Sequence, residues 1–154
     1  MSRGSVEFHE LEEFRDKIKA LEQQDKNALY ESCAKELAAR LLTKVIKRTP
    51  VGQYPKGSGK TGGTLRRGWT AGENKNAAEY AMSLPIRKEG SDYVIEIFNP
   101  VEYAPYVEYG HRTANHRGWV EGKFMMTISV KELETQAPRI IARKIDAFLK
   151  EHFE

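Results

Sequence analysis

Gly59-Lys60-Thr61 is the first group in this sequence whose residue types could do chemistry. In a phosphate-binding P-loop, backbone N–H groups and a lysine hold the phosphates of a nucleotide, while a threonine binds magnesium. The complete pattern requires a glycine where this chain has Tyr54. The segment also stands after an expected helix and before an expected strand, which is the reverse of the P-loop order. Nucleotide hydrolysis is therefore not predicted.

Other reactive groups are equally incomplete. One segment holds four carboxylate and imidazole side chains of the kind that bind zinc or manganese. Their spacing matches neither an H-E-x-x-H helix nor a Cys/His knuckle. They are Glu108, His111, His116 and Glu121. There is no G-x-S-x-G elbow, and Cys33 has no histidine near it in sequence. We expect a protein that is not an enzyme and that has no cofactor or metal.

Positive charge is concentrated in one stretch. The net charge is +3, but residues 37–72 contain eight basic residues and no Asp or Glu, so the remainder carries about −5. Such a stretch attracts phosphate or an acidic protein surface, and composition alone does not separate the two. A solvated face with no partner is the third interpretation. The basic residues are Arg40, Lys44, Lys47, Arg48, Lys56, Lys60, Arg66 and Arg67.

Aromatic residues gather between Tyr103 and Gly110, where the sequence YAPYVEYG holds three tyrosines and a valine. Tyrosine offers a large, rigid contact area with a polar tip, so this composition favours a protein interface. Packing of the segment onto a sheet is the competing interpretation. Trp69 follows the basic stretch and is predicted to lie in the core rather than to stack on a nucleic-acid base.

Helices are predicted where apolar residues recur at spacings of three and four. The pattern predicts an amphipathic helix over 6–21 and a longer one over 28–48, which ends at Thr49 because the next residue is a proline. Two further helices are expected over 123–133 and 138–153, with a proline in the first turn of the second. Cys33 is expected as a small buried residue in the long helix; a lone cysteine fits a reducing compartment.

Strands are predicted over 65–71, 79–87 and 93–98, where apolar and polar residues alternate, with a hairpin connection at 88–92. Residues 51–63 hold five glycines and a proline, which is typical of a long mobile loop. The fold class is therefore α+β: one antiparallel sheet of about three to four strands packed against the long N-terminal helix and the C-terminal helices. At 154 residues the chain is expected to form a single domain, without a membrane span or a signal peptide.

Two motifs in this order resemble the paired signatures of a bacteriophage minor tail component family. The first runs from Thr49-Pro50-Val51 through the glycine-rich loop to GTLRRGW at 63–69, and the second is YAPYVEYG at 103–110. The resemblance covers nearly the whole chain and departs from the pattern in a longer loop. It implies a tail-completion or head-tail joining protein of long-tailed phages and prophages. Copies would form a ring, commonly sixfold, at the end of the tail tube, with DNA passing through the lumen.

The resemblance implies a structural protein of the virion tail, present in the bacterial host cytoplasm during assembly. Its expected partners are further copies of itself in a hexamer, the tail tube protein, head connector proteins, and DNA that passes without sequence readout; no membrane is expected. The alternative is a DNA-binding accessory protein that uses the basic stretch over 40–67. The residues predicted to form the partner interface are Lys56, Lys60, Arg66, Arg67, Tyr103, Tyr106, Glu108 and Tyr109.

Overall fold

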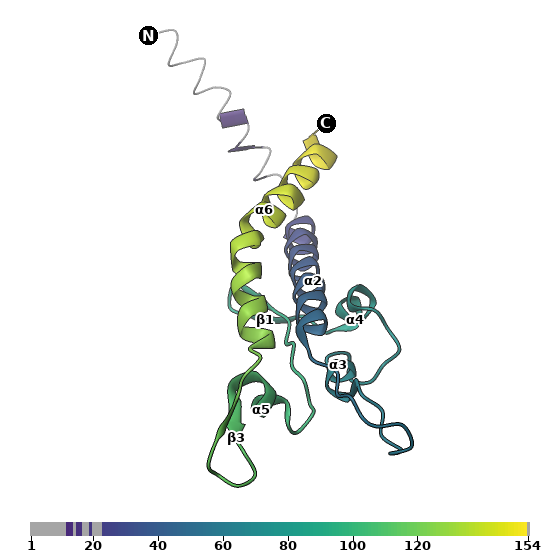
Figure 1. Cartoon of the computed structure of the whole chain (residues 1–154). Helices are drawn as coiled ribbons and strands as arrows, with labels where there is room; N and C mark the ends of the chain where they lie inside the picture. Colours follow the sequence, from purple (N-terminus) through teal and green to yellow (C-terminus); the bar gives the residue numbers. More distant parts are fainter. Residues whose placement is uncertain (1–11, 14, 17–18, 20–22, 154) are drawn as a thin grey trace.

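The computed structural model describes residues 12–13, 15–16, 19 and 23–153, so the helix predicted over 6–21 lies for the most part outside the described residues. Two long antiparallel helices form a stalk, and shorter elements form a wide end at its base (Figure 1). The elements in chain order are α2 (Gln23–Arg48), α3 (Thr64–Gly68), α4 (Ala77–Ser83), β1 (Arg87–Glu89), β2 (Asp92–Val94), α5 (Ala104–Tyr109), β3 (Gly110–Arg112), β4 (Trp119–Glu121) and α6 (Met125–Phe153).

The stalk consists of α2 and α6. The early part of α2 meets the late part of α6, where Lys144 Nζ donates to Ser32 Oγ at 2.8 Å. The end of α2 meets the beginning of α6, where Lys44 Nζ lies 3.2 Å from a carboxylate oxygen of Glu132. The helix predicted over 28–48 is confirmed; it begins earlier, at Gln23, and ends at Arg48.

The sequence predicts two helices over 123–133 and 138–153, but the structure has one. Helix α6 continues through Pro138, and it changes direction near its middle in Figure 1. A proline inside a helix removes one backbone hydrogen bond and kinks the axis without necessarily ending the helix. Both halves of α6 contact α2, which keeps the helix together across the proline.

The strands predicted over 65–71 and 79–87 are wrong, because α3 and α4 occupy these segments. Asn76 is the N-cap of α4: its side-chain oxygen accepts from the backbone N–H of Glu79 at 2.8 Å, and its side-chain nitrogen donates to the Glu79 carboxylate at 2.8 Å. The helix ends before Pro85, where Leu84 is already extended. Lys35 Nζ of α2 then donates to carbonyl oxygens at the end of α4.

The expected class, helices with antiparallel strands, is confirmed, but the strands form two separate two-stranded sheets within the described residues instead of one sheet. The hairpin predicted around 88–92 is present, with Lys88 opposite Tyr93; pairing stops at Val94, so the second half of the strand predicted over 93–98 does not form. A second hairpin, in which His111 lies opposite Val120, occupies a segment expected to be irregular.

The core lies where the lower part of α2 meets α3, α4, α5 and α6. Leu42 and Val45 are fully buried, and Trp69 is only 4% exposed, which confirms its predicted place in the core. Cys33 is half-buried rather than buried; desolvation raises the pKa of its thiol, and the charge of Lys144 opposes this effect. Within the described part of the chain, no helix is both long and apolar enough to cross a membrane.

Candidate interaction site

Thr49 joins α3 to the end of α2. Its buried hydroxyl accepts a hydrogen bond from the indole N–H of Trp69 at 2.7 Å and donates to the carbonyl of Val45. Its own carbonyl accepts from Arg66 Nη2 at 2.6 Å and from Nε at 3.1 Å. Arg66 is half-buried, so the guanidinium predicted to meet a partner is used to attach two elements of the same chain.

Asn99 holds the segment before α5 against α3. Its amide nitrogen donates to the carbonyl of Leu65 at 2.7 Å, and its amide oxygen accepts from the backbone N–H of Val101 at 3.1 Å. A Cβ at Gly68 would lie only 2.2 Å from the Asn99 oxygen, so the approach requires glycine at this position. The end of α2, α3 and the chain leading into α5 therefore form one connected unit.

Glu108 fixes α5 against the beginning of α6. The side chain is 7% exposed, and its two carboxylate oxygens accept from the backbone N–H groups of Met126 at 2.8 Å and Thr127 at 3.0 Å. The Thr127 hydroxyl donates to the same carboxylate at 2.7 Å. A carboxylate in this position satisfies the free N–H groups of a helix N-terminus and complements its dipole. Glu108 therefore offers no exposed carboxylate to a partner.

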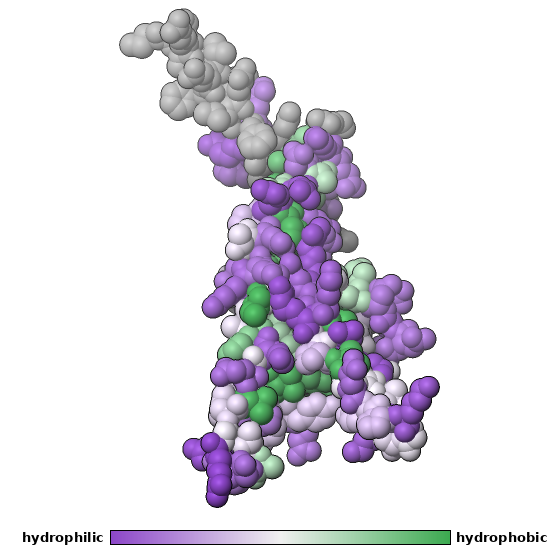
Figure 2. All heavy atoms as spheres, in the orientation of Figure 1, coloured by the Kyte–Doolittle hydropathy of each residue, from purple (hydrophilic) through white to green (hydrophobic). Residues whose placement is uncertain are grey.

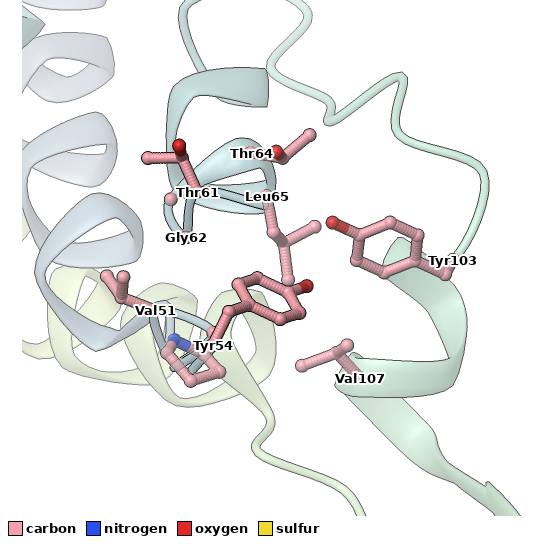
Figure 3. A pocket seen from close by; sticks show the side chains of 11 residues that line it. Val51, Tyr54, Thr61, Gly62, Thr64, Leu65, Tyr103 and Val107 are labelled. Atoms are coloured by element: carbon pink, nitrogen blue, oxygen red, sulfur yellow. The ribbon is translucent and has the colours of Figure 1, made fainter. Parts of the chain in front are cut away.

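The loop over 51–63 leaves the wide end through a narrow neck. A Cβ at Gly62 would collide with the carbonyl oxygen of Gly52. The two ends of the loop therefore approach each other as closely as a glycine allows. Figure 3 shows Tyr54 at this neck, with its ring directed toward Leu65, Tyr103 and Val107. These side chains surround a pocket of about 230 Å³. Beyond the neck the loop is exposed, including Lys56 and Lys60.

Four large aromatic side chains are exposed on α5 and on the β3–β4 hairpin, and we call them the aromatic surface. Tyr106, Tyr109 and Trp119 are 59%, 64% and 56% exposed, and Tyr103 is 44% exposed. Tyr106 makes an edge-on contact with His111, with ring centroids 6.1 Å apart. A cavity of about 470 Å³ is lined by Tyr103 and Tyr106 together with Val107, His111 and Arg112, so this part of the surface is hollowed.

Several members of the basic stretch are engaged within the stalk. Lys44 and Arg48 both bind the Glu132 carboxylate, and the Arg48 guanidinium also donates to Ser129 Oγ at 3.2 Å. Arg48 first, and then Lys44, lowers the pKa of Glu132. Arg40 pairs with Glu36 one turn away on α2. The stretch is therefore not the continuous free cationic face that its composition indicates.

The predicted interface residues consequently divide into two groups. Lys56, Lys60 and the three tyrosines are exposed; the Lys60 ammonium lies 5.7 Å from the centroid of the Tyr54 ring. Arg67 is exposed but donates to the carbonyl of Gly62 at 3.2 Å. Arg66 and Glu108 hold the fold together, as described above.

The four residues weighed as metal ligands do not form a ligand set. Glu108 caps α6, and the His111 ring bonds to the carbonyl of Arg112. Among the described residues, no group of three His, Cys, Asp or Glu side chains is arranged to hold a metal ion. Trp119 is exposed but was not among the predicted interface residues. It lies in a segment that is rich in aromatic, glycine and turn-forming residues, like the segment that holds the tyrosines.

A comparison with known protein families finds a match for this chain. Residues 12–110, more than half of the chain, match the family described as "Bacteriophage HK97-gp10, putative tail-component". Neither the curated proteins nor the solved structures contain a significant match. The matched range includes α2, the loop, α3, and the tyrosines of α5. The chain belongs to the HK97-gp10-like family of bacteriophage tail components.

Proposed function

We propose that this tail component is a non-enzymatic structural protein that completes the tail or joins it to the head, by assembling into a ring at the end of the tail tube. The observation that carries the proposal is the aromatic surface, which is exposed in this chain. The chain's membership of a tail-component family supports the same role. Several large aromatic side chains left exposed on neighbouring short elements are typical of a surface that a partner covers.

Ring closure requires two different patches on each subunit, because each copy contacts one neighbour with one patch and the next neighbour with another. The aromatic surface supplies one patch. The loop over 51–63, with exposed Lys56 and Lys60, supplies the other, and it is long enough to order on contact with a neighbour or with the tail tube. Glu108 and Arg66 are left out of both patches because they bond within the chain.

Partners outside the ring follow from the same position. At the end of the tail tube, one rim of the ring meets the tube protein and the other meets connector proteins of the head. DNA would pass through the lumen. Under this proposal the protein acts in the virion tail after assembly in the bacterial cytoplasm, and its hexameric state is reached in the particle.

Deletion of the gene from the parent phage or prophage tests the role. Particles are induced and examined by negative-stain electron microscopy. The proposal predicts filled heads that are separate from tails, or tails of abnormal length, and rescue by the wild-type gene supplied in trans. Normal, DNA-filled, tailed particles from the deletion strain would contradict the proposal.

The second candidate is a DNA-binding accessory protein that uses the basic stretch over 40–67. The structure leaves it fewer free charges than the sequence indicates, since Lys44 and Arg48 bind Glu132. Arg66 is also occupied, at the carbonyl of Thr49. The stretch as a unit is therefore a weaker basis for function than the aromatic surface.

A further inference from the structure

A second face of the molecule, opposite in character to the aromatic surface, begins on α2. Arg40, Thr43 and Lys47 follow one another at spacings of three and four, so they lie on one side of the helix. All three are exposed. In Figure 2 the middle of the stalk is covered mainly by hydrophilic side chains. This row lies between two grooves.

The first groove lies between α2 and α6 and has a volume of about 340 Å³. Arg40 lines it from α2, and Arg139 and Arg143, one turn apart, line it from α6. Thr135 and Gln136 add a hydroxyl and an amide. Three guanidinium groups from two helices therefore border a single polar groove, although Arg139 lies 99 residues after Arg40 in the chain.

The second groove continues from the end of α2 to α3 and the segment before α4, with a volume of about 700 Å³. Its basic side chains are Lys47 and Lys75, together with Arg66 and Arg67, which keep their charge while they donate to the carbonyls of Thr49 and Gly62. Thr43, Thr70, Asn74 and Asn76 line it with hydroxyl and amide groups, above a floor that includes Ile46 and Ala77. Thr43 and Lys47 thus connect this groove to Arg40 and the first one.

Few acidic groups offset this charge. Of the residues that line the two grooves, seven are basic and one, Glu73, is acidic; Glu73 is paired with Lys75. Arg40 is paired with Glu36. Among the described residues, Lys47, Arg139 and Arg143 have no hydrogen-bonding or ion-pair partner. We call the two grooves, with the row between them, the basic face.

We infer that the basic face contacts the phosphate backbone of double-stranded DNA without reading its sequence. Arginine and lysine combined with threonine, asparagine and glutamine are the side chains that bind DNA phosphates. Charged and neutral polar side chains make up most of the lining of both grooves and no aromatic residue lines either one, whereas the centre of a protein interface is enriched in aromatic residues and depleted of charge. This inference goes beyond the proposed ring, because it assigns a face to DNA and depends on α6 residues outside the basic stretch.

The inference is tested by fluorescence anisotropy with a labelled 30-base-pair duplex over a range of salt concentrations. The slope of log K against log salt is negative, and each lost phosphate contact makes it less steep by about 0.9. The double variant Arg139→Gln with Arg143→Gln is expected to reduce the steepness of the slope by about 1.8, and Lys47→Gln alone by about 0.9. Circular dichroism checks that each variant is folded.

The matched control is Lys131→Gln with Lys150→Gln, which removes the same charge from exposed positions of α6 outside both grooves. We expect its slope to stay close to that of the wild type. Equal losses in the control and in the Arg139/Arg143 variant would overturn the inference, because they would indicate diffuse attraction. No binding of duplex by the wild type, or equally tight binding of poly-glutamate as an acidic protein probe, would also overturn it.

The DNA-binding measurements do not depend on particle assembly, so the two proposals can fail separately. Failure of DNA binding with a normal requirement for the gene in tail assembly would reject the basic face and leave the proposed function standing. Salt-dependent DNA binding with normal particles from the deletion strain would do the reverse.

Discussion

The stalk and the wide end of this protein are stabilised in different ways. Along α2, apolar side chains recur at helical spacing and face inward, and Leu42 and Val45 are fully buried. At the wide end, the short elements pack Leu65, Trp69 and Ala81 against the same part of α2, and buried polar groups, above all Thr49 and Glu108, fix their positions. The exposed large aromatic side chains of α5 and the second hairpin belong to this second region.

Under the proposed function, the wide end is the part of the molecule that would serve assembly. Apolar burial is non-directional and gives a stable helix pair, whereas hydrogen bonds position small elements without burying all their apolar area. Tyr106 and Tyr109 remain more than half exposed although they lie next to the core elements. A partner that covers these side chains would supply the burial that the fold does not.

The largest effect is expected from Leu42→Ala in the core, where the end of the stalk meets the wide end. Truncation of a fully buried leucine removes apolar burial and leaves a cavity, so the free energy of unfolding should fall by about 3 kcal/mol. Urea denaturation measures the change. Met82→Ala is the control, because this side chain is 67% exposed on α4. A loss below about 1 kcal/mol would show that apolar burial in this core is not what stabilises the subunit.

Glu108→Ala is the corresponding test at the wide end. It removes three hydrogen bonds to the first turn of α6 and should lower the free energy of unfolding by about 2 kcal/mol. Glu121→Ala, an exposed residue of β4, serves as the control and should change it by less than about 0.5 kcal/mol. Equal effects of the two substitutions would show that the hydrogen bonds of Glu108 do not stabilise the contact between α5 and α6.

Acid should weaken the contact between the two stalk helices. Arg48 and Lys44 lower the pKa of Glu132 in the folded state, so its contribution is complete above the unfolded-state pKa and is lost as pH falls through the lower folded-state value. Unfolding measured between pH 7 and pH 3 should show a smaller loss for Glu132→Gln than for the wild type. An identical pH dependence in both proteins would exclude this ion-pair group as a source of acid sensitivity.

The smallest effect on stability is expected at the aromatic surface. Tyr106→Ser with Tyr109→Ser removes two exposed rings, so the free energy of unfolding should change by less than about 0.5 kcal/mol. Urea denaturation of the double variant provides the measurement. A loss above 2 kcal/mol would show that these rings stabilise the subunit itself, and the contrast between the two regions would fail.

Helical periodicity predicted the stalk well because its signal is local and long. The recurring apolar residues of α2 and the stop at Pro50 are both visible in the sequence. Alternation over 79–87 was misleading, because over so few residues an alternating pattern does not exclude a helix. The capping pair Asn76 and Glu79 was the better local signal, and it marks the true beginning of α4.

The candidate site was predictable in composition but not in role. Exposure of the tyrosines agrees with an interface, yet Glu108 in the same motif is a structural cap for a helix that starts 17 residues later. Arg66 is likewise drawn to a carbonyl 17 residues earlier. Such bonds depend on tertiary approach, which neither spacing nor charge counting reveals. Arg139 and Arg143 lie beside Arg40 only because α6 packs antiparallel to α2, and this packing could not be predicted from the spacing of the residues.

The most direct measurement is complementation of the deletion phage with the Tyr106→Ser, Tyr109→Ser variant. Plaque titre and the fraction of tailed particles by electron microscopy are compared with wild type and with Met82→Ser, which alters an equally exposed side chain on α4. We predict a loss of roughly 100-fold or more in titre for the tyrosine variant, with separate heads and tails, and near-normal values for the control. Full rescue by the tyrosine variant would contradict the claim that the aromatic surface is the assembly interface.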